Sequence, residues 1–277
     1  MTTAPPPADT LLLADVGNSR IKLAAVEDPG LAPSGQRVAA PRLAHRREID
    51  VRGLQTRLLR QWLAAAAPAA AHVLVASVHD RAAAMLELAI AEESATGRRV
   101  LRQQRVTHAD LPLEVALPEP QRVGIDRLAA AAAARALVPP GSAAIVVDCG
   151  TAATVDMVDG SGAFLGGAIL PGPVLMARAL AEGTSKLPEV QALDGDDPPA
   201  MPGRGTRDAI AAGIGWGIRG AIAELVARAR ATLGAPTPVV VTGGWRRAVL
   251  PAVPDALEAP DLVLTGIALA TRRVGAG

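Results

Sequence analysis

The chain contains the same short sequence device twice. In its N-terminal part, an apolar run that begins at Leu11 leads into Asp15-Val16-Gly17-Asn18-Ser19, and in its middle a run that begins at Ala144 leads into Asp148-Cys149-Gly150-Thr151. Each apolar run is typical of a buried strand. An Asp at the end of a strand can hold a cation, and the Gly after it lets backbone N–H groups approach a phosphate closely. The two copies together predict two similar halves around a nucleotide cleft.

Each copy by itself also fits a simpler interpretation. A β-hairpin places Asp, Asn and Gly at its turn for conformational reasons alone, and a single copy would favour that interpretation. Because the device occurs twice, and a second strand-like run follows it each time, we favour nucleotide binding.

The composition sets the class of protein. A chain of 277 residues, half of them hydrophobic and 20% charged, can bury a core in one large domain or two ordinary ones. Its net charge of +1 gives no reason to expect nucleic acid or a membrane surface as a partner. The single cysteine cannot form an internal disulfide, and the N-terminus lacks a signal-peptide pattern. No apolar run reaches the roughly 18 residues of a membrane span. We therefore expect a cytoplasmic protein with no nucleic acid and no membrane partner.

The first half is expected to begin with a hairpin and to continue with helix–strand units. Alternation and helical spacing predict strands over Thr10–Val16, Arg20–Val26, Gln36–Arg46, His72–Val78 and Val100–Val106. They also predict a helix that carries Val51, Leu54, Leu58 and Trp62, and a second helix over Arg81–Glu93. The prolines at positions 112, 118 and 120 then mark a boundary. The expected halves are residues 9–118 and 119–277.

The second half repeats this order with a longer helix. The same patterns predict helices over Gly124–Leu137, Thr206–Leu233 and Asp261–Arg273, and strands over Ala143–Asp148, Ala153–Val158, Ala163–Leu170 and Val239–Thr242. The stretch Gly183–Gly205 is rich in Pro, Gly and Asp and is predicted to be a long loop. The whole chain is predicted to be an α/β protein with mixed sheets.

A further polar motif stands at the start of the predicted helix Gly124–Leu137. In Gly124-Ile125-Asp126-Arg127, the Asp could accept a hydroxyl proton while the Arg holds an anionic substrate. The alternative is ordinary helix-start chemistry, since acidic residues are favoured in a first turn. Taken alone, the motif favours that alternative.

These segments together resemble one family. DVGNS at 15–19, GIDR at 124–127, DCGTAATVD at 148–156, GGAILPG at 166–172, TSKLP at 184–188 and TGG at 242–244 follow the order and spacing of the type III pantothenate kinases. The resemblance covers nearly the whole chain. It implies an α/β, duplicated actin-like ATPase fold of the ribonuclease H-like kind. It also implies transfer of the γ-phosphoryl group of ATP to the primary alcohol of pantothenate, the first step of coenzyme A biosynthesis.

The resemblance also implies roles for individual residues. Asp126 would be the proton acceptor, Asp15 would bind Mg²⁺ through water, and Asp148 would bind the monovalent cation, K⁺ or NH₄⁺. The ATP-binding residues would be Asp15, Val16, Gly17, Asn18, Ser19, Arg20, Ile21, Lys22 and Thr151. The pantothenate-binding residues would be Leu117, Gly124, Ile125, Asp126, Arg127 and Thr184. The family forms homodimers, so a homodimer is expected here.

Two points of the sequence leave alternatives open. Leu117 stands where the family usually has a Tyr, seven residues before Gly124, and this chain has no Tyr at all. The alternatives are a kinase for another small alcohol, and a weak or inactive kinase-fold protein with a transcription-accessory role, since some members of the family were once called Bvg accessory factors. Trp245 follows Gly243-Gly244 near the expected adenine region, where stacking on the base and simple packing both fit.

Overall fold

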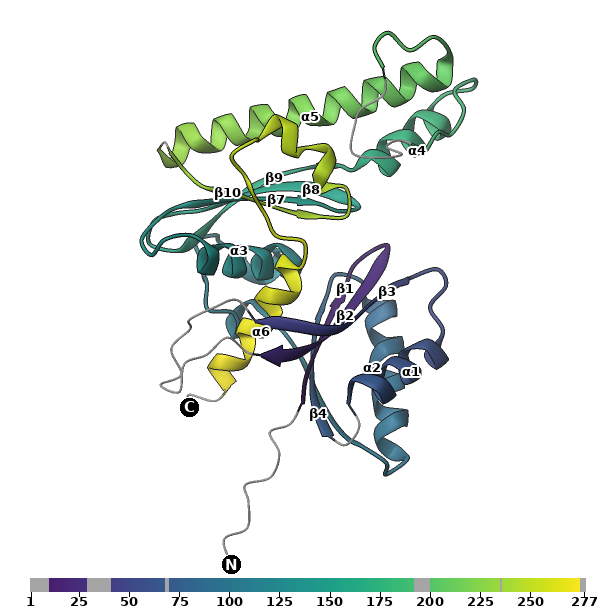
Figure 1. The fold of residues 1–277 in the computed structure, drawn as a ribbon, viewed down its shortest axis with the longest axis vertical. Coiled ribbons are helices and arrows are strands. Elements are labelled where there is room, and N and C mark those ends of the chain that lie inside the picture. Colours follow the sequence, from purple (N-terminus) through teal and green to yellow (C-terminus); the bar gives the residue numbers. More distant parts are fainter. Residues whose placement is uncertain (1–9, 29–40, 68–69, 192–199, 235, 275–277) are drawn as a thin grey trace, which may run out of the picture. The chain divides into compact units, whose positions relative to one another are not determined.

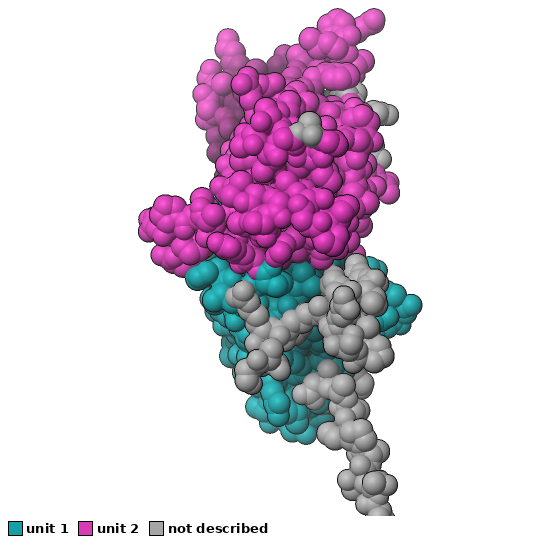
Figure 2. All heavy atoms as spheres, turned by 90° about the vertical axis from the view of Figure 1, so that its left-hand side faces the viewer, with its two compact units in different colours: residues 1–112, 124–129, 263–277 teal, residues 113–123, 130–262 magenta. Residues whose placement is uncertain are grey.

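The computed structural model describes residues 10–28, 41–67, 70–191, 200–234 and 236–274. The chain divides into two compact units, which Figure 2 distinguishes by colour. Unit 1 consists of residues 1–112, 124–129 and 263–277, and unit 2 consists of residues 113–123 and 130–262.

Unit 1 is built on a five-stranded sheet with the order β3-β2-β1-β4-β5. The strands are β1 (Thr10–Val16), β2 (Arg20–Asp28), β3 (Arg42–Asp50), β4 (Ala70–Ser77) and β5 (Val100–Arg105). The first three form an antiparallel meander, whereas β4 pairs with β1, and β5 with β4, in parallel. A parallel pair needs a crossover connection, which is usually helical.

Helices α1 (Thr56–Ala66) and α2 (Asp80–Ala95) cover one face of this sheet (Figure 1). Alternate β1 residues Leu12, Ala14 and Val16 point to that face and pack with Leu59 of α1 and Leu86 of α2. The period of two along the strand and the helical spacing of the apolar side chains together produce this core.

Unit 2 contains a six-stranded sheet with the order β11-β10-β7-β8-β9-β6. Its strands are β6 (Glu114–Val115), β7 (Ala144–Cys149), β8 (Ala152–Val158), β9 (Ala163–Pro171), β10 (Val239–Gly243) and β11 (Leu257–Glu258). The helices that follow β9 are α4 (Pro173–Gly183) and α5 (Thr206–Leu233), and α5 packs Ile218, Ile222 and Val226 on one face of the sheet (Figure 1). Helix α3 (Ile125–Leu137) belongs to unit 1 up to Ala129 and to unit 2 after it, and α6 (Leu262–Val274) belongs to unit 1 from Val263 onward.

The remaining regular elements are short. Single 3₁₀ turns occupy His108–Asp110, Pro120–Arg122, Arg246–Ala248 and Leu250–Ala252.

Five strands of the sheet in unit 2 follow the same order as the five strands of the sheet in unit 1. Reading β9-β8-β7-β10-β11 beside β3-β2-β1-β4-β5 matches each strand with a counterpart. In both, an antiparallel hairpin comes first, and a later strand pairs in parallel with the first strand of that hairpin. The duplication predicted from the repeated Asp-x-Gly device is therefore confirmed in the topology.

Four details differ from the sequence predictions. The helix expected around Val51 begins only at Thr56, because Val51 and Leu54 reach the same core from the preceding turn. The third strand is Arg42–Asp50, later than predicted, and positions 36–40 of the prediction lie outside the described residues. Helix α4 was not predicted, although Pro173 stands in its first turn, where proline is favoured. The two-residue strands β6 and β11 carry too little pattern to predict.

Helix α5 is, within the described part of the chain, the one helix long and apolar enough to cross a membrane by length and composition. A core helix of a soluble protein passes the same test, and α5 buries its apolar stripe against the sheet of unit 2.

Candidate functional site

The first Asp-x-Gly loop (residues 15–19) is the turn between β1 and β2. Asp15 is buried and lies opposite Lys22 in the antiparallel pair. The N–H of Gly17 donates to the carbonyl of Arg20 at 3.0 Å, which closes the turn. Asn18 and Ser19 at its tip are exposed. The turn thus offers a carboxylate at the strand end and polar groups at an open tip.

Three of the other expected ATP-binding residues have mainly structural environments. Val16 and Ile21 are completely buried in the core of unit 1, so only their backbones could contact a ligand at this loop. Arg20 is exposed, and its guanidinium pairs with Glu48 of β3 at 2.8 Å.

The second Asp-x-Gly loop (residues 148–151) is the turn between β7 and β8. Asp148 lies between Thr154 of β8 and Thr242 of β10 in the strand registers. The N–H of Gly150 donates to the carbonyl of Ala152 at 3.1 Å, so the Gly of the device closes this turn too, with one residue fewer than in the first loop. Thr151 is exposed at the tip. The two loops are therefore equivalent positions of the duplicated fold.

Cys149, inside the second loop, has no nucleophilic character. Its side chain is completely buried, and burial, with the nearby negative charge of Asp148, raises the pKa of its thiol far above the ordinary value. A thiol that stays protonated packs as a small apolar group.

The start of α3 places a carboxylate beside the first sheet. A Cβ built on Gly124 would contact Cγ1 of Val78 at 3.7 Å, and the N–H of Val78 donates to the carbonyl of Val16 at 3.1 Å. Gly124 is thus next to the residue that follows β4, and β4 is adjacent to β1. Asp126 and the first Asp-x-Gly loop consequently belong to the same end of the sheet in unit 1.

Gly124 is required by the position of the Asp126 carboxylate. Oδ1 of Asp126 accepts the backbone N–H of Arg127 at 2.8 Å, and a Cβ added at Gly124 would lie 2.5 Å from the same oxygen. Burial raises the pKa of Asp126, while the hydrogen bond from the Arg127 backbone and the positive charge of Arg127 act in the opposite direction. Raised pKa values of this kind are common at functional sites. Ile125, between Gly124 and Asp126, is buried, and Arg127 is half-buried.

Two of the expected pantothenate contacts lie in unit 2. Leu117 is half-buried and lies beside Gly166 of β9. A Cβ atom added to Gly166 would be 3.6 Å from Cδ2 of Leu117. The hydroxyl of Thr184 donates to the carbonyl of Leu180 at 2.8 Å and accepts the N–H of Leu187 at 3.3 Å, so it closes the C-terminus of α4. Its exposed position still leaves it accessible to a ligand.

Trp245 makes a hydrogen bond that no motif of the sequence predicts. Its indole N–H donates to the carbonyl of Gly150 at 2.7 Å, and the rest of the ring packs on the core of unit 2. Packing was one of the two interpretations of Trp245. The tight Gly243-Gly244 turn before it was the available signal that this residue approaches a neighbouring strand.

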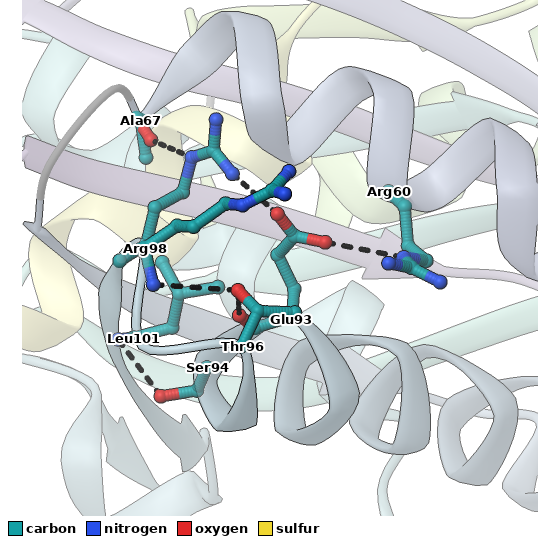
Figure 3. Close-up of polar contacts among 8 residues, drawn as sticks. Arg60, Ala67, Glu93, Ser94, Thr96, Arg98 and Leu101 are labelled. Atoms are coloured by element: carbon teal, nitrogen blue, oxygen red, sulfur yellow. Dashed lines mark hydrogen bonds and ion pairs between the residues drawn. The ribbon is translucent and has the colours of Figure 1, made fainter.

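A separate polar cluster in unit 1 connects α1, α2 and β5 (Figure 3). The carboxylate of Glu93 pairs with Arg60 at 3.1 Å and with Arg99, and Arg99 also donates to the carbonyl of Ala67 at 2.8 Å. An open groove of about 550 Å³ lies above it. Because the Glu93 carboxylate is saturated by two guanidinium groups, we interpret the cluster as structural.

No group of three or more His, Cys, Asp or Glu side chains that could hold a metal ion occurs among the described residues. A metal at either loop would need other oxygen ligands beside the one Asp, from the backbone, hydroxyl groups, the substrate or water.

Comparison with known families identifies one match. The family model described as type III pantothenate kinase matches residues 11–228. Relatives named type III pantothenate kinase include one from Nitratidesulfovibrio vulgaris, 43% identical over 176 residues, covering 62% of this chain and 66% of the relative. Another, from Dehalococcoides mccartyi, is 41% identical over 157 residues, covering 56% and 58%. A third, from Rhodopirellula baltica, is 41% identical over 197 residues, covering 69% and 68%. The chain thus spans less than two thirds of the length of the first two of these relatives.

Solved structures support the fold. A protein of Campylobacter jejuni described as a candidate Baf family transcriptional activator superposes with a TM-score of 0.55 at 18% identity, covering 95% of this chain and 98% of that one. A candidate 2-dehydro-3-deoxygalactonokinase of Sinorhizobium meliloti gives 0.51 at 15% identity, covering 96% and 100%. With the matching strand orders, these similarities confirm the predicted duplicated nucleotide-binding fold.

Proposed function

Since this chain belongs to the type III pantothenate kinase family, we propose that it phosphorylates the primary hydroxyl of pantothenate with ATP, the first step of coenzyme A biosynthesis. The observation that carries the proposal is the position of Asp126. Its carboxylate is held at the start of α3, at the same end of the sheet in unit 1 as the first Asp-x-Gly loop.

In this proposal Asp126 accepts the proton of the pantothenate hydroxyl. An alcohol is a poor nucleophile, and a base near the hydroxyl orients its lone pair toward the γ-phosphorus. Burial raises the pKa of the Asp126 carboxyl, which makes its carboxylate a stronger base than an exposed one. Arg127, the next residue, would hold the carboxylate of pantothenate by a charge-assisted hydrogen bond.

The two Asp-x-Gly loops would bind the phosphates of ATP. Each is a tight turn at a strand end with exposed polar residues at its tip, Asn18 and Ser19 in the first and Thr151 in the second. Backbone N–H groups in such turns form a concave surface that suits anions. Lys22, opposite Asp15 in the hairpin, would add positive charge beside the first loop. Leu117 and Thr184 are proposed as further pantothenate contacts.

The residues present fit the cations that this family would use. Mg²⁺ usually binds one or two carboxylates together with phosphate oxygens and water, so a single strand-end Asp15 suits it through water. Asp148, in the equivalent position of unit 2, would hold K⁺ or NH₄⁺. When bound, these cations would neutralise charge that develops on the phosphoryl group.

A homodimer and a cytoplasmic location complete the proposal. Unit 2 exposes large apolar side chains on β9, α4 and α5, namely Ile169, Val174, Leu175 and Trp216. In the proposed dimer, the partner subunit would cover such side chains. Light scattering should give a dimer at micromolar concentration, and Val174→Asp, at a position 71% exposed, should shift it toward monomer. A wild-type monomer at that concentration would contradict this part of the proposal.

The decisive experiment replaces Asp126 by Asn and measures release of ADP with pantothenate as the only acceptor. Loss of a general base typically lowers kcat by about 10²–10⁴-fold, and we expect a decrease of that order with ATP affinity nearly unchanged.

Asp80→Asn is the matched control, because Asp80 is also an acidic residue in a first helical turn, at the start of α2, and is fully exposed. Ordinary helix-start chemistry predicts near-normal turnover in both variants. That result would remove the chemical basis of the proposal. Turnover with another small alcohol and not with pantothenate would redirect it to a different acceptor.

A further inference from the structure

Trp245 contacts the second Asp-x-Gly loop from the neighbouring strand. It follows β10, which pairs in parallel with β7 so that Gly243 lies beside Cys149. The indole N–H of Trp245 donates to the carbonyl of Gly150 at 2.7 Å, and its backbone N–H donates to the carbonyl of Cys149 at 3.4 Å. Two consecutive carbonyl groups of the loop are thus held by one residue.

The close approach depends on Gly243. This residue has a φ of +94°, and a Cβ added to it would lie 2.4 Å from backbone atoms of Cys149. On the other side of the loop, the N–H of Gly172 donates to the carbonyl of Thr151 at 3.0 Å. The carbonyl groups of residues 149, 150 and 151 therefore all accept hydrogen bonds from the protein, and their directions are fixed.

The direction of the Gly150 carbonyl determines the direction of the next N–H. A peptide group is planar and trans, so its C=O and N–H point to opposite sides. With the Gly150 carbonyl directed at the indole, the N–H of Thr151 is directed away from it, at the exposed tip of the loop. If this peptide group were rotated, its carbonyl oxygen would face the anion instead. The partial negative charge of that oxygen would repel the anion.

We infer that Trp245 is a positioning residue that holds the Gly150–Thr151 peptide so that the Thr151 N–H donates to a phosphate of the nucleotide. The inference rests on the proposed function of the second loop and concerns a residue outside the motifs that define the family resemblance.

The segment that carries Trp245 is itself firmly anchored. Arg219, a buried residue of α5, donates to the carbonyl of Ala248. Arg246 donates to the carbonyl of Gly243 at 3.1 Å and pairs with Glu258 at 2.7 Å. The indole is therefore attached to a rigid turn, as a positioning role requires.

The test uses Trp245→Phe, which keeps most of the ring and removes the N–H donor. Trp62→Phe is a matched control, because the Trp62 indole N–H donates to the carbonyl of His45, also at 2.7 Å, in unit 1. We expect Trp245→Phe to raise the dissociation constant of ADP on the order of 10-fold, with the KM for pantothenate within about twofold of the native value. Trp62→Phe should change only the melting temperature. Equal ADP affinity in the two variants would overturn the inference.

A second measurement needs no variant. In the native protein labelled with ¹⁵N-threonine, ADP should move the Thr151 amide resonance downfield, as expected when an N–H donates to phosphate, and an unmoved resonance would equally overturn the inference. Neither measurement uses pantothenate turnover. If the native protein failed to phosphorylate pantothenate, the proposed function would fail while the role of Trp245 would still be decided by ADP binding.

Discussion

Replacing Glu93 by Gln should destabilise unit 1 far more than a similar change at the surface. The Glu93 side chain is only 7% exposed, and its two oxygens contact Arg60 and Arg99. Arg99 is 15% exposed and also holds the carbonyl of Ala67. The substitution keeps the size of the side chain and removes its charge, so the guanidinium groups of Arg60 and Arg99 lose their common partner.

The magnitude follows from the burial of each arginine. The hydrogen bond to the nearly buried Arg99 involves two charged groups, for which losses of about 1.5–3 kcal/mol are typical. Arg60 is 46% exposed and can turn to water, so its share is about 0.2–1 kcal/mol. The sum is about 2–4 kcal/mol. At about 2–4 °C per kcal/mol for a large domain, the melting temperature should fall by roughly 4–16 °C.

Differential scanning calorimetry measures this effect, with Glu224→Gln as the control. Glu224 pairs with Arg228 on α5 at 2.7 Å, but the two side chains are 61% and 79% exposed. The control should lose only a few tenths of a kcal/mol, roughly. Equal decreases in melting temperature in the two variants would refute the argument from burial. Loss of turnover in Glu93→Gln without destabilisation would show that the cluster is functional and not structural.

Three further predictions concern the proposed site. If Asp148 binds a monovalent cation, turnover should rise steeply when Na⁺ is replaced by K⁺, and Asp148→Asn should abolish that response; equal native activity in both salts would disprove the assignment. Leu117→Tyr should alter the KM for pantothenate more than that for ATP, and a shift confined to ATP would mean that Leu117 does not line the pantothenate site. Burial raises the pKa of Asp126, so ionisation of this carboxyl is less favourable in the folded protein than in the unfolded chain. This difference lowers the free energy of unfolding at neutral pH. Asp126→Asn should therefore melt above the native protein at pH 7, and the difference should disappear as the pH falls through the raised pKa toward 3.8; a lower melting temperature at pH 7 would contradict this sign.

Local sequence patterns determined most elements of this protein. The strands on both sides of each Asp-x-Gly loop, and the helix Thr206–Leu233, were predictable because apolar alternation, helical spacing and turn residues act over a few positions. The helix prediction was wrong around Val51, because a turn, and not a helix, places the apolar side chains there against the core. The repetition of the device also predicted the duplicated fold, since equivalent local sequences build equivalent hairpins.

Only the tertiary structure decided which distant residues share a site. The boundary expected after the prolines assigned Asp126 to the second half, yet Gly124–Ala129 packs with unit 1, beside Val78 at the end of β4. Trp245 and Gly150 are 95 positions apart in the sequence and joined by one hydrogen bond, and Glu93 meets Arg60 from another helix. Such pairs form because parallel strand pairing and helix packing bring separate segments together. Local propensity carries no information about that pairing, because its energy comes from surfaces buried between segments far apart in the chain.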